Sequence, residues 1–79
     1  MVSFKKIEQI YFQGDSICMK LDDKVYCVPL HLLSTKLASA TDTERSVFFL
    51  SPSGYGIHWP VIDEDLSIEG IIRVAGTLP

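Results

Sequence analysis

The sequence predicts a small α+β domain, in which an antiparallel sheet, a three-stranded meander plus a C-terminal hairpin, packs with two or three short helices. The chain has 79 residues, a length that can enclose one thin hydrophobic core. Hydrophobic residues make up 47% of it, a fraction too high for a disordered chain. Turn residues divide its first third into short strand-like stretches. Apolar residues at helical spacing occur only over short segments. We therefore expect residues 1–79 to form a single domain.

The meander is predicted for residues 7–28. Three strand-like stretches are separated by two short turns, at Gly14-Asp15 and at Asp22-Asp23. Two-residue turns fix the pairing register, and this register makes one face of the meander almost wholly apolar. The residues of that face are Ile10, Phe12, Ile17, Met19, Leu21, Tyr26 and Val28.

The same register places Cys18 directly opposite Cys27 on the other face of the meander. Such a pair has its Cα atoms about 4.5 Å apart, close enough for a disulfide under oxidising conditions. The first ten residues lack the apolar stretch of a signal peptide, and no apolar run approaches the roughly 20 residues needed to cross a bilayer. We expect a cytoplasmic protein without membrane contact, in which both cysteines are thiols.

Two short helices are expected after the meander. Pro29 can end the third strand and open a helical turn. Three leucines then repeat at helical spacing, which predicts a helix over residues 30–38. Residues 41–44 have the pattern of a capping box, in which a threonine hydroxyl and a glutamate carboxylate bind the free amides of a helix start. This pattern predicts a second, very short helix.

A hairpin and a last helix are predicted for the second half of the chain. Residues 47–50 and 55–59 are strand-like and flank a turn, which places Phe48 near Trp59. Residues 61–66 are expected to form an acidic, solvated loop. Ser67 then caps a short helix that docks its isoleucines on the sheet, and the residues from Ala75 onward are expected to be loose.

A resemblance to a known family rests mainly on residues 54–70, which read GYGIHWPVIDEDLSIEG. This segment is similar to the hallmark of the bacterial domain of unknown function 2442 family (DUF2442). The order of upstream features agrees as well, and the resemblance covers about residues 7–73. The chain departs from the family at Asp23, where glycine is usual, and at residues 32–36, where the family has an aromatic-Pro-Arg cluster.

The resemblance implies a small α+β domain without an established activity. Members of this family are sometimes fused to a helix-turn-helix, and they are often encoded beside another small protein in pairs that resemble toxin–antitoxin modules. The resemblance therefore implies binding to a protein partner encoded by a neighbouring gene. It implies no catalysis and no cofactor.

The charge pattern points to one end of the chain as a binding surface. Residues 46–79 carry Arg73 against four carboxylates, so the net charge of −3 arises there. Residues 46–62 contain no charged side chain but four aromatic ones. An aromatic surface rimmed by carboxylates suits a basic protein partner, although the same aromatics could simply form the core. The candidate partner-binding residues are Tyr55, His58, Trp59, Asp63, Glu64, Asp65 and Glu69.

Other functions have weaker support in the sequence. His58 with the acidic loop could hold a metal or another ligand, or form the centre of an enzyme. Either cysteine could pair with His31 or His58 as a nucleophile, but nothing supplies an activating neighbour. Lysines 5, 6, 20 and 24 could contact nucleic acid, yet an acidic chain makes direct binding a poor fit. We therefore favour a non-catalytic interaction module, an antitoxin-like protein or a small inhibitor of a host or phage protein.

Overall fold

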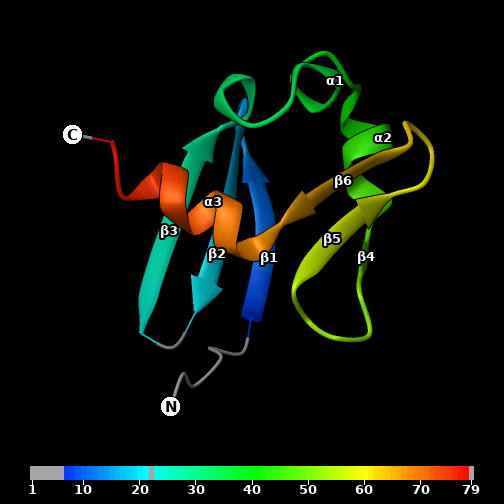
Figure 1. The fold of residues 1–79 in the computed structure, drawn as a ribbon. Helices are drawn as coiled ribbons and strands as arrows, with labels where there is room; N and C mark the ends of the chain where they lie inside the picture. The colour runs from blue at the N-terminus through cyan, green and yellow to red at the C-terminus, as the bar shows by residue number, and fades with distance from the viewer. Residues whose placement is uncertain (1–6, 22, 79) are drawn as a thin grey trace.

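Two three-stranded antiparallel sheets form the framework of the computed structural model, which describes residues 7–21 and 23–78 (Figure 1). The first sheet has the order β1-β2-β3, and the second has the order β4-β5-β6. The strands of the first sheet are β1 (Ile7–Gln13), β2 (Ser16–Leu21) and β3 (Lys24–Pro29). Those of the second are β4 (Phe49–Leu50), β5 (Gly56–Trp59) and β6 (Glu64–Ser67).

Short helical segments connect and cover the sheets. A 3-10 helix, η1 (Leu30–Leu32), and the helices α1 (Thr35–Ala38) and α2 (Asp42–Ser46) lie between β3 and β4. Helix α3 (Ile68–Ala75) follows β6 and lies across one face of the first sheet (Figure 1). The predicted α+β class is confirmed.

The predicted register of the meander is confirmed from Gln9 onward, whereas β1 shifts by one residue between Ile7 and Gln9. Phe12 pairs with Ile17, and Met19 lies between Ile10 and Tyr26. Gly14, in the first turn, has a φ of 59°, a conformation that glycine adopts without steric cost. Asp22, in the second predicted turn, lies outside the described residues. The apolar face is buried or half-buried along β2 and β3 and forms much of the core.

Cys18 pairs with Cys27 as predicted, with their Cα atoms 4.1 Å apart. The expectation that both are thiols is wrong for this structure, because the two sulfur atoms form a disulfide. Cys18 is fully buried, whereas Cys27 is exposed. The disulfide joins the central strand β2 to the edge strand β3.

The helix predicted over residues 30–38 is interrupted. Ser34 is extended, with a φ of −160°, and its Oγ accepts the backbone N–H of Leu37. A serine hydroxyl that binds a nearby amide competes with the helix ladder and favours a new helix start. The segment therefore splits into η1 and α1, although Leu30 and Leu37 are both buried as the spacing indicated.

Two expectations for the C-terminal part are also wrong. The predicted acidic loop contains the strand β6, which pairs with β5 through Ile57 and Leu66. Acidic residues have a low propensity for strands, so the sequence pattern did not predict β6. The residues after Ala75 are not loose throughout, because Leu78 packs against the core; Pro79 lies outside the described residues.

Trp59 lies at the centre of the core that both sheets share. It is fully buried, and its ring centroid lies 6.1 Å from that of Phe48, the contact predicted from the hairpin register. Phe12 of the first sheet contributes a third ring, 6.5 Å from Trp59. The indole Nε1 donates a hydrogen bond to the backbone oxygen of Arg45 (3.0 Å), which satisfies its one polar group.

The capping box predicted at Thr41 and Glu44 is present and starts α2. This short helix carries Arg45, whose guanidinium is buried. Its Nε donates to the backbone oxygen of Leu37 and its Nη2 to that of Ala38, both at 2.9 Å. These carbonyls end α1, and carbonyls at a helix end lack a partner within the helix.

The same guanidinium reaches the first turn of the meander. Arg45 Nη1 donates to the backbone oxygen of Gly14, and Nη2 lies 3.4 Å from the exposed carboxylate of Asp15. One side chain thereby connects α1, α2 and the turn between β1 and β2. No local sequence pattern predicted this role of Arg45.

We predict that Arg45→Met destabilises the domain by about 2 to 4 kcal/mol, because it removes the charged donor shared by the backbone oxygens of Leu37, Ala38 and Gly14. Arg73→Met is the matched control. The Arg73 side chain is exposed and pairs with Glu69 on the same helix, so its loss should cost less than about 0.5 kcal/mol. Urea denaturation measures both, and equal stabilities would contradict the structural role of Arg45.

We also predict that the disulfide is intramolecular in protein purified in air. Alkylation of the denatured, unreduced chain should modify neither cysteine, and prior reduction should make both reactive. Mass spectrometry distinguishes these products. Cross-linked dimers without an internal bond would contradict the strand register.

Candidate functional site

The second sheet presents one row of side chains away from the core. Phe49 of β4 pairs with His58 of β5, and His58 pairs in turn with Asp65 of β6. Successive side chains of a strand point to opposite faces, and Ile57 and Trp59, the neighbours of His58, are buried. We call Phe49, His58 and Asp65 the outer row.

His58 and Asp65 interact directly within this row. The Nδ1 atom of His58 lies 2.7 Å from Oδ1 of Asp65, a hydrogen-bond distance. The backbone N–H of Ile68 donates to the backbone oxygen of Tyr55, so these two residues form a hydrogen-bonded pair of the ladder between β5 and β6. Hydrogen-bonded and non-hydrogen-bonded pairs alternate along an antiparallel ladder, which makes His58 and Asp65 a non-hydrogen-bonded pair. Side chains come closest in pairs of this kind. Both side chains remain accessible, at 43% and 76% exposure.

The apolar end of the outer row is Phe49, whose exposure of 62% is the highest among the large hydrophobic residues that the structure describes. Val47 and Leu50 of the same segment are also exposed, as is Tyr55. Contiguous exposed apolar surface marks interaction sites on soluble proteins, and Phe49 is the member of this segment that lies on the outer face beside His58. Phe49 was not among the predicted site residues, although strand alternation after the core residue Phe48 would have placed it on the opposite face.

The predicted acidic cluster is divided among different contacts. Glu64 is half-buried, and its carboxylate accepts hydrogen bonds from the Ser34 hydroxyl and from the backbone N–H of Asp65. The hydrogen bond from Ser34 is the main cause that lowers the pKa of Glu64 below its usual value. Glu64 therefore supports α1. The expectation that its carboxylate is solvated is wrong.

Asp63 is exposed and occupies the turn before β6, with a φ of 52°. Its backbone oxygen accepts a hydrogen bond from Lys36 Nζ (3.1 Å). Glu69 lies on α3 and pairs with Arg73 at 3.0 Å. Of the four predicted acids, only Asp65 therefore contacts His58.

Trp59 does not belong to a binding surface. Its side chain is completely buried, so the alternative interpretation of this aromatic as a core residue is correct. Tyr55 lies just before β5 and is half exposed.

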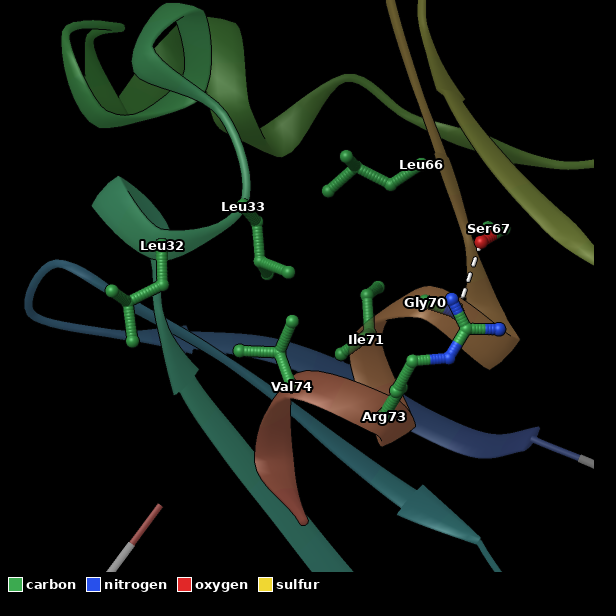
Figure 2. A pocket seen from close by; sticks show the side chains of 8 residues that line it. All are labelled: Leu32, Leu33, Leu66, Ser67, Gly70, Ile71, Arg73 and Val74. Carbon is green, nitrogen blue, oxygen red and sulfur yellow. Dashed lines mark hydrogen bonds between the residues drawn. The ribbon is translucent and has the colours of Figure 1, made fainter. Parts of the chain in front are cut away.

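A shallow hollow of about 260 Å³ lies elsewhere, between α3 and the segment that follows β3. Figure 2 shows apolar side chains from both segments pointing toward one another, and the hydrogen bond from Gly70 N–H to Ser67 Oγ at one side. The described residues that line it include no His, Cys, Asp or Glu. The lining residues are Leu32, Leu33, Leu66, Ser67, Gly70, Ile71, Arg73 and Val74.

The other proposed chemistries find little geometric support. Among the described residues, no group of three His, Cys, Asp or Glu side chains is arranged to hold a metal ion. The disulfide engages both cysteines, so neither is a free nucleophile in this structure. Lys20 and Lys24 are exposed, while Lys5 and Lys6 lie outside the described residues. No helix in the described ranges is long and apolar enough to span a bilayer.

The fold and the outer row define a small α+β domain that exposes an aromatic side chain beside a histidine–carboxylate pair. The chain belongs to the DUF2442 family, described as a protein of unknown function, whose model matches residues 7–76. A crystal structure of a protein of unknown function from Rhodospirillum rubrum has the same fold, with a TM-score of 0.73 and 22% sequence identity. The match covers 90% of this chain and 88% of that one. No curated protein shows significant similarity to the chain.

We predict an acid-dependent loss of stability that depends on Glu64. Because folding lowers the pKa of Glu64, its contribution is present above the usual value of about 4.5 and is lost as the pH falls through the lower folded value. The effect should be below about 1 kcal/mol, since solvent screens this half-buried group.

The measurement is thermal unfolding from pH 7 to pH 3. Glu64→Gln should be less stable than the natural protein at pH 7 and should lose less stability on acidification. Glu69→Gln keeps the contact between Ser34 and Glu64, so it should retain the natural acid dependence. Identical profiles for Glu64→Gln and Glu69→Gln would contradict the prediction.

Proposed function

We propose that this domain is a non-catalytic interaction module that binds and restrains a protein partner through the outer row. The observation that carries the proposal is the arrangement of Phe49, His58 and Asp65 side by side on one exposed sheet face. The partner would be a basic protein encoded by a neighbouring gene. The module would act as the antitoxin-like member of such a pair or as a small inhibitor.

The apolar end of the row supports binding. Aromatic side chains are enriched at protein interfaces, where a few well-buried anchors contribute most of the affinity. Phe49 has a rigid ring and is 62% exposed, so covering it would remove much apolar surface from water. Val47, which caps the end of α2 just before β4, is exposed as well.

The other end of the row supports a basic partner. Asp65 carries an exposed carboxylate, and the exposed Asp63 lies two residues before it. His58 holds the Asp65 carboxylate in one orientation, so that a partner's Arg or Lys meets a placed acceptor and not a mobile one. Complementary charge of this kind accelerates association more than it slows dissociation.

The alternative of a ligand-binding site, metal site or enzyme centred on His58 and the acidic loop has less support. Glu64 turns toward Ser34 and so does not complete a ligand set with His58 and Asp65. Two side chains on an open sheet face do not exclude water or surround a substrate, as small-molecule sites usually do. A flat surface of mixed apolar and charged groups suits a protein partner better.

The test uses the product of the adjacent gene, purified with this domain and titrated calorimetrically. Asp65→Asn should weaken binding several-fold and reduce its dependence on salt, because one interfacial charge is lost. Glu69→Gln removes the same charge from α3 and should bind as the natural protein does. Unchanged affinity and salt dependence for Asp65→Asn would contradict the proposed surface.

A further inference from the structure

We propose that the Cys18–Cys27 disulfide is a reversible exchange site for low-molecular-weight thiols, in which Cys27 carries the mixed disulfide and Cys18 displaces the bound thiol. The two cysteines lie opposite each other on β2 and β3, on the face of the first sheet that points away from the core. This chemistry does not depend on the proposed protein partner, because no residue of the outer row takes part in it.

The two cysteines differ in their access to solvent. Cys27 is exposed and belongs to β3, an edge strand of the first sheet. Cys18 is fully buried on the central strand β2, where Tyr11 of β1 is its neighbour on the other side. The side chain of Gln13 also reaches Cys18, with its Oε1 atom 3.9 Å from Sγ. Of the two cysteines, Cys27 is therefore the one that a thiol in solution can reach.

The direction of the bond favours attack at the same sulfur. A thiolate attacks one sulfur of a disulfide from the side opposite the sulfur that leaves. For attack on Cys27 this approach comes from beyond β3, where the sheet ends. For attack on Cys18 it comes from over β1, at the position of Tyr11. An open strand edge requires no groove for the reagent, so a small thiol is sufficient.

The backbone ladder keeps the two cysteines opposite each other when the bond is open. The backbone N–H of Leu30 donates to the oxygen of Asp15 (2.8 Å), and hydrogen-bonded and non-hydrogen-bonded pairs alternate from there along β2 and β3. Cys18 and Cys27 are therefore a non-hydrogen-bonded pair with a hydrogen-bonded pair on each side. The buried residues of these flanking pairs are Ile17, Met19 and Val28. Hydrogen bonds and burial thus hold the register without the covalent link.

The exchange balances in two steps. A thiolate RS⁻ forms a bond to Cys27 Sγ, the bond between the two cysteines breaks, and its electron pair leaves on Cys18 as a thiolate. A second RS⁻ attacks the sulfur that carries R, which forms RSSR and releases the Cys27 thiolate. Two thiols thereby supply the two electrons that reduce the disulfide, and the protons are exchanged with water.

The same steps run in the opposite direction with RSSR as the oxidant. The Cys27 thiolate takes RS from RSSR and releases RS⁻, after which Cys18 attacks Cys27 Sγ, expels the second RS⁻ and restores the internal bond. Redox-sensing cysteines are solvent-accessible and often lie next to a resolving cysteine. Cys27 and Cys18 have this arrangement, with their Cα atoms 4.1 Å apart.

The test exposes single-cysteine variants to oxidised glutathione and follows their masses by mass spectrometry. Cys18→Ser should form a mixed disulfide on Cys27 and retain it, because the resolving thiol is absent. Cys27→Ser should react at least ~10-fold more slowly, since a buried thiol reacts only after local opening. Both variants should react equally fast once they are denatured. The reduced natural protein should return to the internal disulfide and retain no glutathione.

A second measurement uses the natural chain, so it does not require either variant to fold. Reduction by glutathione is stopped at short times with an alkylating reagent in denaturant. Trypsin then cleaves after Lys20 and Lys24, which separates the two cysteines. The bound glutathione should be found on the peptide that contains Cys27.

Equal modification of the two variants with both folded would overturn the proposal, as would glutathione on the peptide that contains Cys18. Unchanged partner binding by Asp65→Asn would contradict the proposed protein-binding surface but would leave the exchange site unaffected. The two hypotheses therefore fail separately.

Discussion

The buried guanidinium of Arg45 is the interaction on which the arrangement of this domain depends. It binds the carbonyls that end α1 and reaches the turn between β1 and β2, while its own backbone oxygen accepts the indole N–H of Trp59. A buried charge is tolerated only where hydrogen bonds replace its hydration, so these segments must converge for Arg45 to fold inward. The position of the second sheet follows, because Trp59 belongs to β5.

The sequence predicted most of the local structure because short turns and caps act over a few residues. The meander register, the capping box at Thr41 and the cap at Ser67 all fall in this class. The role of Arg45 depends on carbonyls eight residues earlier and on a turn about thirty residues away, and no local pattern encodes such contacts. Strand β6 was missed because pairing with β5 overrides the low strand propensity of its acidic residues.

The candidate site was predicted only in part, for a related reason. Counting charge along the chain groups Glu64 with Asp65, yet strand alternation sends one toward Ser34 and the other toward His58. The same alternation buries Trp59 and exposes Phe49. Once β6 is known to be a strand, the outer row follows from period-two spacing alone. The unrecognised strand β6 therefore explains why Glu64 was grouped with Asp65, whereas the burial of Trp59 and the exposure of Phe49 follow from alternation along β5 and β4, which the sequence did predict.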